Sequence, residues 1–246
     1  FQALAQPTAD LIDDNITIKH GVNGAPADGD DSIAHIVKKD AKISYQATLD
    51  MQSLKFGANP EHADTVRIIR AAMTSAGVTS LWDFIKNNSI DIFADSKVNL
   101  YVKFSDKLEN PATLDGITLK SGWFKLDPTK QPAYDDTTKY WTIPCVIKDE
   151  GDEGVNTKNP MITLSGVSLS LTADAQGKLN SNTALDIISE GYIDGTIKIS
   201  TLELSLIGKS KDDPVKNTAK LKLAVPTYTV TYTDGVNGSA FKDQIA

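Results

Sequence analysis

Apolar and polar residues alternate over most of the chain. Between residues 43 and 49 the odd-numbered positions are apolar, and between residues 98 and 104 the even-numbered ones are. A period of two is typical of β-strands that bury one face. The same pattern predicts further strands at residues 16–18, 117–124, 140–147 and 219–225.

The alternation changes phase at two places. Ile162 and Leu164 are out of phase with Val167, and Gly166 lies between them. One extra residue in a strand shifts the phase in this way, so we predict a β-bulge at Gly166. A second change of phase falls between residues 199 and 202.

One segment has a helical pattern instead. Asn59 is a suitable N-cap, Pro60 follows it at the first helical position, and Gly77 is placed as a C-terminal stop. Ser80 begins a second short helix that reaches about residue 88, with a capping-box-like start. The apolar stripe of the first helix, which we expect to face the core, consists of Val66, Ile69 and Met73.

Many short strands, frequent turn signals and one helical segment are typical of a sandwich. We therefore predict an all-β, Ig-like β-sandwich over residues 16–225, with a short helical insertion at about residues 60–88. The pattern leaves open whether this range holds one β-domain or two smaller ones. Residues 1–15 are polar, and we expect them to form a linker. Pro226 cannot donate to a strand ladder, so we expect it to separate this domain from the next module.

The segment after Pro226 carries a family resemblance. Residues 228–244 read YTVTYTDGVNGSAFKDQ, which is similar to the opening of the Listeria–Bacteroides repeat, also called the internalin B-type B repeat. Proteins with such repeats are secreted, stalk-like and not known as enzymes. The resemblance implies that residues 226–246 begin a truncated B-repeat module, and that the chain is extracellular and belongs to a bacterial cell surface.

Composition narrows the class of partner. The 246 residues have a formal net charge of −7, which makes nucleic acid an unsuitable partner. No apolar run approaches the roughly 20 residues that a membrane helix needs, so we expect no membrane span in this fragment. The single cysteine, Cys145, excludes an internal disulfide framework. We expect a monomer.

Residues typical of catalytic or metal sites are scattered. The three histidines lie apart, no G-x-S-x-G elbow or glycine-rich phosphate loop is present, and Cys145 lies within an apolar run. Acidic turns at residues 28–31 and 149–153 offer oxygen ligands to calcium, but neither matches the twelve-residue calcium loop, and acidic turns are usually solvated. We therefore predict no enzyme, no cofactor and no metal.

A second resemblance covers three patches of the main domain. Residues 15–23 and 39–49 resemble the first strands of Gram-positive pilin and adhesin Ig-like modules. Residues 98–108 and 114–120 are similar to the strand and D-x-L-x-x-G-L element of that family, although the motif is matched loosely. Residues 216–221, KNTAKL, resemble its final strand.

The pilin resemblance implies a possible intramolecular isopeptide bond. In that family a lysine of the first strand joins an asparagine of the last, which here correspond to Lys19 and Asn217. The chemistry needs a neutral, buried amine and a buried carboxyl group that carries the proton and polarises the amide. Asp106 and Glu203 are the two carboxyl candidates.

These observations together predict a structural or adhesive module of a multi-domain surface protein, with a host or matrix protein or a glycan as its partner. The alternative is a carbohydrate-binding module. In that case three aromatic residues would form an exposed platform for sugar stacking, although tryptophan in a sandwich is more often part of the core. These residues are Trp123, Tyr140 and Trp141.

Overall fold

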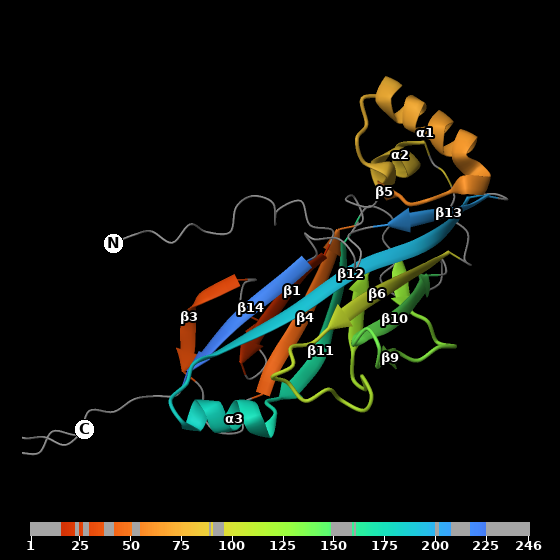
Figure 1. The fold of residues 1–246 in the computed structure, drawn as a ribbon. Helices are drawn as coiled ribbons and strands as arrows, with labels where there is room; N and C mark the ends of the chain where they lie inside the picture. The colour runs from red at the N-terminus through yellow and green to blue at the C-terminus, as the bar shows by residue number, and fades with distance from the viewer. Residues whose placement is uncertain are drawn as a thin grey trace, which may run out of the picture.

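The fold is a two-layer β-sandwich with helices at its ends (Figure 1). The computed structural model describes residues 16–22, 25–26, 30–36, 42–50, 55–88, 90, 96–148, 159, 161–199, 202–207 and 217–224. The predicted linker at residues 1–15 and the predicted B-repeat segment at residues 226–246 lie outside these ranges. Within them the predicted all-β, Ig-like sandwich with a helical insertion is confirmed.

Five of the described strands form the smaller sheet, in which every pairing is antiparallel. Its strand order is β2 (Ala25–Pro26), β1 (Ile16–Val22), β4 (Lys42–Asp50), β11 (Met161–Ser170) and β7 (Thr118–Ser121). Strands distant in sequence are therefore neighbours, since β4 pairs with both β1 and β11.

The other nine described strands form the larger sheet. Its main path is β3 (Asp30–Ile36), β14 (Asn217–Ala224), β12 (Leu185–Ile199), β6 (Lys97–Lys103), β10 (Tyr140–Ile147) and β8 (Phe124–Leu126). Three short strands attach to this path, namely β5 (Lys55–Phe56), β9 (Ala133–Asp135) and β13 (Leu202–Ile207). The long strand β12 connects three strands of the sheet, because it pairs with β14, β6 and β13.

The two sheets share one contiguous apolar core. Alternate residues of β4 and β11 point into it from the smaller sheet, and alternate residues of β6, β10 and β12 meet them from the larger one. The largest fully buried side chains include Tyr45, Phe124, Leu100, Ile143 and Ile187. The described strands therefore form one sandwich rather than two smaller units.

The predicted bulge lies in β11. The register between β4 and β11 shifts between Leu164 and Val167, and Gly166 has a φ of +87°. A Cβ atom at Gly166 would lie 2.4 Å from the carbonyl oxygen of Gly116. Only glycine fits both the left-handed backbone and this close approach.

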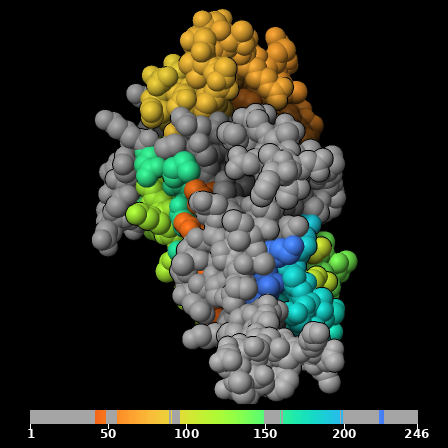
Figure 2. All heavy atoms as spheres, turned by 90° about the vertical axis from the view of Figure 1, so that its left-hand side faces the viewer, coloured from red at the N-terminus to blue at the C-terminus, as the bar shows by residue number. Residues whose placement is uncertain are grey.

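The helical insertion connects β5 to β6 and forms one end of the molecule (Figure 2). It contains η3 (Pro60–His62), α1 (Ala63–Ser75) and α2 (Leu81–Asn87). The Ser80 hydroxyl accepts a hydrogen bond from the Asp83 backbone N–H and caps α2, as predicted. Gly77, with a φ of +67°, ends α1, and the Val78 N–H bonds back to the Met73 carbonyl oxygen, which is the Schellman arrangement.

The α1 stripe faces the core as predicted. Val66 is buried, and Ile69 and Met73 are partly buried against the same cluster. The rings of Trp82 and Trp123 join the insertion to the sandwich, with their centroids 4.4 Å apart. A third helix, α3 (Ala173–Asn180), lies at the opposite end of the molecule (Figure 1). No helix of the described residues is long and apolar enough to span a membrane.

One strand prediction was wrong. Residues 117–124 do not form one strand but contain β7 and the first residue of β8, and these two strands belong to different sheets. The chain turns between them because the Ser121 hydroxyl accepts hydrogen bonds from the backbone N–H groups of Trp123 and Phe124. The sequence patterns also gave no sign of β2 or of β3, which pairs in parallel with β14.

Candidate binding surface

The outward face of the larger sheet carries the most distinctive group of polar and aromatic side chains. Strands β10, β6 and β12 lie side by side, with Thr142, Tyr101 and Tyr192 in adjacent register positions. The alternate residues Leu100 and Val102 are buried in the core. The pleat of the strands therefore directs the tyrosines away from the core.

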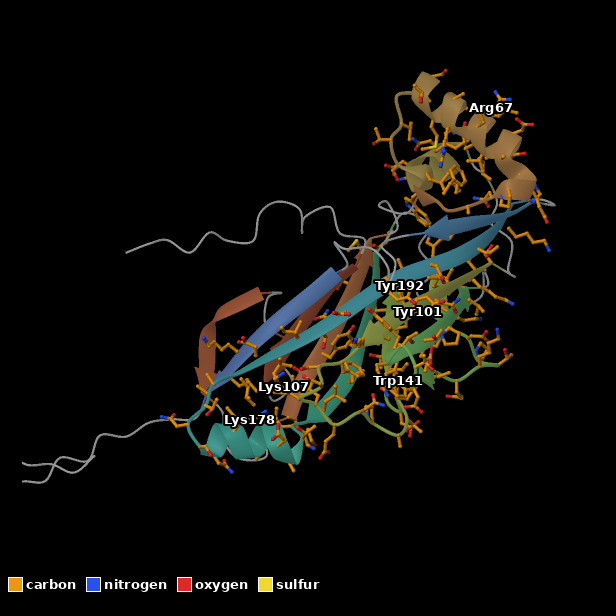
Figure 3. All side chains as sticks on the ribbon, viewed as in Figure 1. Arg67, Tyr101, Lys107, Trp141, Lys178 and Tyr192 are labelled. Carbon is orange, nitrogen blue, oxygen red and sulfur yellow. The ribbon has the colours of Figure 1, made fainter. Side chains whose placement is uncertain are left out.

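Three tyrosines form an aromatic cluster on this face. The rings of Tyr101 and Tyr192 are stacked, with centroids 4.2 Å apart and planes 4° from parallel. Tyr140 meets Tyr192 edge-on at 5.2 Å, and the Lys103 ammonium lies 5.8 Å from the centre of the Tyr140 ring. Figure 3 shows Tyr101 and Tyr192 together on the neighbouring strands β6 and β12. We call Tyr101, Tyr140 and Tyr192 the tyrosine cluster.

Two carboxylates of β12 are held by these phenols. The Tyr101 hydroxyl lies 3.0 and 3.2 Å from the two carboxylate oxygens of Asp194, and the Asn99 amide lies 3.4 Å from one of them. The Tyr140 hydroxyl donates to Glu190 at 3.0 Å. Burial and the nearby Asp194 carboxylate raise the pKa of Tyr101 well above its usual range. The Tyr101 hydroxyl therefore remains a donor at physiological pH.

A hollow of about 350 Å³ adjoins the tyrosine cluster where β6 ends. Its lining mixes apolar surface with charges of both signs, and Ile188 is one of the few large apolar side chains exposed among the described residues. The lining residues are Lys103, Phe104, Ser105, Asp106, Lys107, Asp186, Ile188 and Glu190. The hollow and the tyrosine cluster are adjacent, because Lys103 and Glu190 line the hollow and also contact Tyr140.

The exposed sugar platform considered from the sequence is wrong. Trp141 is 2% exposed and packs in the core, where its indole N–H donates to Asn110 at 2.8 Å. Tyr140 is 6% exposed, and Trp123 packs against Trp82. The tryptophans and Tyr140 are thus used for packing, and they offer no free ring face for a sugar.

Three of the four residues predicted for the isopeptide bond lie on strands. Lys19 is in β1, Asn217 in β14 and Glu203 in β13, and the side chains of all three lie outside the described part of the structure. Strands β1 and β14 belong to different sheets but are in contact with each other. The bond remains a prediction.

Asp106 does not have the environment that the cross-link chemistry requires. Its side chain is 86% exposed and pairs with the Lys107 ammonium at 2.9 Å. The hydrogen bond from Lys107 lowers the pKa of Asp106, whereas a proton-carrying carboxyl beside a buried lysine needs a raised pKa. The Asp106 assignment is therefore wrong on physical grounds, and Glu203 remains the carboxyl candidate.

The described residues give little support to metal binding or to nucleophilic catalysis by Cys145. They contain no group of three His, Cys, Asp or Glu side chains that could hold a metal ion. The acidic turn at residues 149–153 lies outside the described ranges. Cys145 is buried, and burial raises the pKa of its thiol to about 12. A thiol in this environment is a poor nucleophile.

Sequence reasoning missed the tyrosine cluster. Tyr101, Tyr140 and Tyr192 are far apart in the chain, and they meet because β10, β6 and β12 are adjacent in the sheet. The sequence contained only a weak sign of the cluster. Tyr101 occupies a polar-phase position of an alternating strand, which marks it as outward-facing but says nothing of its neighbours.

No family model matches the chain, and no curated protein matches it either. Among solved structures, the chain is similar to ACE19, the collagen-binding subdomain of the Enterococcus faecalis surface protein ACE. The alignment covers 79% of this chain and 92% of that chain, with 8% identity and a TM-score of 0.29.

Proposed function

We propose that the chain is a non-enzymatic adhesive module of a bacterial cell-surface protein, and that the outward face of its larger sheet binds the partner. One observation carries the proposal. The tyrosine cluster lies on a face built from regular strands, with the phenols of Tyr101 and Tyr140 hydrogen-bonded to Asp194 and Glu190. Tyrosine is enriched at protein interfaces because it offers a large rigid ring together with a polar end.

The extracellular location and the multi-module setting are supported by the two family resemblances in the sequence. The pilin-like patches span much of the main domain, and residues 228–244 resemble a B repeat. Both kinds of module belong to stalk-like surface proteins. A sandwich domain followed by a further module suits a surface protein that holds its binding surface at a distance from the cell.

A protein partner suits the surface better than a glycan. Tyr101 and Tyr192 stack on each other, so each of these rings keeps at most one face for a ligand. Tyr140 is buried beneath the Lys103 ammonium. The adjoining hollow, with Ile188 and charges of both signs, offers contacts for apolar and charged side chains of a polypeptide. We therefore propose a host or matrix protein as the partner.

The proposal is tested on an array of matrix proteins, host proteins and glycans. We expect the wild-type chain to bind at least one protein, and Tyr192→Ala to weaken that binding by about tenfold or more, as expected for an aromatic anchor. Ile68→Ala is the matched control, because Ile68 is exposed on α1, a different part of the molecule. Binding that Tyr192→Ala leaves unchanged, or binding to glycans alone, would contradict the proposal.

A further inference from the structure

The carboxylate of Asp194 has neutral partners only among the described residues. It accepts hydrogen bonds from the Tyr101 hydroxyl and the Asn99 amide, and none of the ion pairs in this part of the structure includes it. The nearest outward-facing lysine in the paired strand, Lys97, is opposite Thr196, one step further along the face. Asp194 is partly buried, so its charge is less screened than that of a fully exposed carboxylate.

Aromatic rings adjoin this charge. Tyr101 holds Asp194 through its hydroxyl and stacks on Tyr192, which is two residues from Asp194 on the same face of β12. A cation at this position is attracted by the negative charge of the carboxylate. It is also attracted by the quadrupole of the electron-rich rings beside it. The alkyl stem of a long basic side chain can also pack on the tyrosine rings.

We propose that Asp194 and the stacked pair Tyr101–Tyr192 form a subsite for one basic side chain, arginine or lysine, of an extended partner polypeptide. The inference rests on the proposed function, since it names the chemistry that the partner presents to the same face. Charge complementarity supports a basic partner, because the chain has a net charge of −7 and Asp194 is not neutralised within the described residues. The fixed carboxylate and the rigid ring pair would be in place before the partner arrives.

Arginine fits this subsite better than lysine. Its guanidinium is planar, so it can stack on a tyrosine ring while it donates to the carboxylate, whereas an ammonium acts as a point charge. Asp194 has lone pairs left for such bonds, because the two oxygens of a carboxylate together accept about four hydrogen bonds. Tyr101 and Asn99 occupy only part of that capacity.

The test uses two synthetic peptides of nine residues, rich in serine and proline so that they stay extended, with arginine or citrulline at the centre. Citrulline has the shape of arginine without its charge. Binding to the full chain is followed by protein NMR, because tyrosine resonances report both affinity and place. We expect the arginine peptide to bind about five- to tenfold more tightly and to shift the Tyr101 and Tyr192 signals, as one ion pair with ring stacking implies.

Asp194→Asn is the decisive variant, since asparagine keeps one oxygen that accepts the Tyr101 hydrogen bond, removes the charge and replaces the other oxygen by an NH2 group. It should abolish the preference for arginine over citrulline. Asp115→Asn is the matched control, because Asp115 is an exposed carboxylate that accepts a hydrogen bond from the Thr113 hydroxyl. This control should keep the preference.

Any of three results would overturn the proposed subsite. The wild-type chain could bind both peptides equally tightly, it could bind neither peptide, or the Asp194→Asn variant could still prefer arginine over citrulline. The array experiment separates this failure from that of the proposed function. If Tyr192→Ala abolishes binding on the array while Asp194→Asn does not, the face binds a partner but Asp194 does not recognise a basic side chain.

Discussion

At Gly166, two separate constraints act on one residue. The φ of +87° is strained for any residue with a side chain, and a Cβ atom would lie 2.4 Å from the Gly116 carbonyl oxygen. Gly177 in α3 presents the opposite case, because nothing lies within 4 Å of the Cβ position there. In a helix interior glycine only adds flexibility to the unfolded chain, so its replacement by alanine favours folding.

The first prediction compares these two glycines by urea unfolding. Gly166→Ala should lower the free energy of unfolding by about 2–4 kcal/mol, as backbone strain and the clash combine. Gly177→Ala should raise it by about 0.5–1 kcal/mol. A Gly166→Ala variant as stable as the wild type would show that the bulge can relax without cost.

The second prediction concerns Cys145. Because burial raises the pKa of its thiol to about 12, the reactive thiolate is scarce near neutral pH, and the sulfur is also shielded from reagents. A chromogenic thiol reagent at pH 8 should therefore detect no free thiol in the folded chain. In denaturant it should detect the one cysteine of the sequence. Rapid labelling of the folded chain would mean that β10 opens readily.

At the scale of elements, the amphipathic patterns proved the most informative part of the sequence. Burial on one face leaves a period of two in β4, β6 and β10, and Gly77 and Ser80 mark the end of α1 and the start of α2. The predicted N-cap Asn59 precedes η3 rather than α1, and its side chain makes no capping hydrogen bond. Helix α3 was missed because only Ala175 and Leu179 of its residues are buried, and Gly177 weakens the helical signal. Its Thr172 N-cap was the available sign.

The candidate surface was less predictable for a physical reason. A strand pattern tells which face a residue occupies but not which strand lies beside it. The order β10, β6, β12 joins strands from three distant parts of the chain, and that order brings Tyr101, Tyr140 and Tyr192 together. A packed position for Trp123 and Trp141 was easier to expect, since large aromatics in a sandwich usually pack inside.

The third prediction tests how the helical insertion is attached. Ile69 is partly buried against the core, whereas its neighbour Ile68 is 60% exposed. Ile69→Ala should therefore lower the free energy of unfolding by about 1–3 kcal/mol, less than a fully buried isoleucine would cost. Ile68→Ala, the same change one residue away, should alter it by less than about 0.5 kcal/mol. Equal effects would mean that α1 is not docked through this stripe.

At the scale of the whole molecule, stability depends on holding two sheets together without disulfides. The sheets share one core, and β1 of the smaller sheet is in contact with β14 of the larger one. The strands that carry Lys19 and Asn217 are these two. A covalent link between them would join the first and last described strands of the domain and close nearly all of it into one loop.

The last prediction is this cross-link. Attack of the Lys19 amine on the Asn217 carboxamide forms an amide and releases ammonia, so the intact chain should weigh about 17 Da less than its sequence. Closing a loop of this length stabilises a fold by about 5 kcal/mol in the loop-entropy model. Asn217→Ala should restore the full mass and lower the melting temperature, and Glu203→Gln should do the same if Glu203 carries the proton.

Asp106→Asn is the control and should leave the bond intact, because the exposed Asp106 lacks the required environment. If the wild-type chain has its unmodified mass, no such bond forms, and β1 and β14 are not covalently joined.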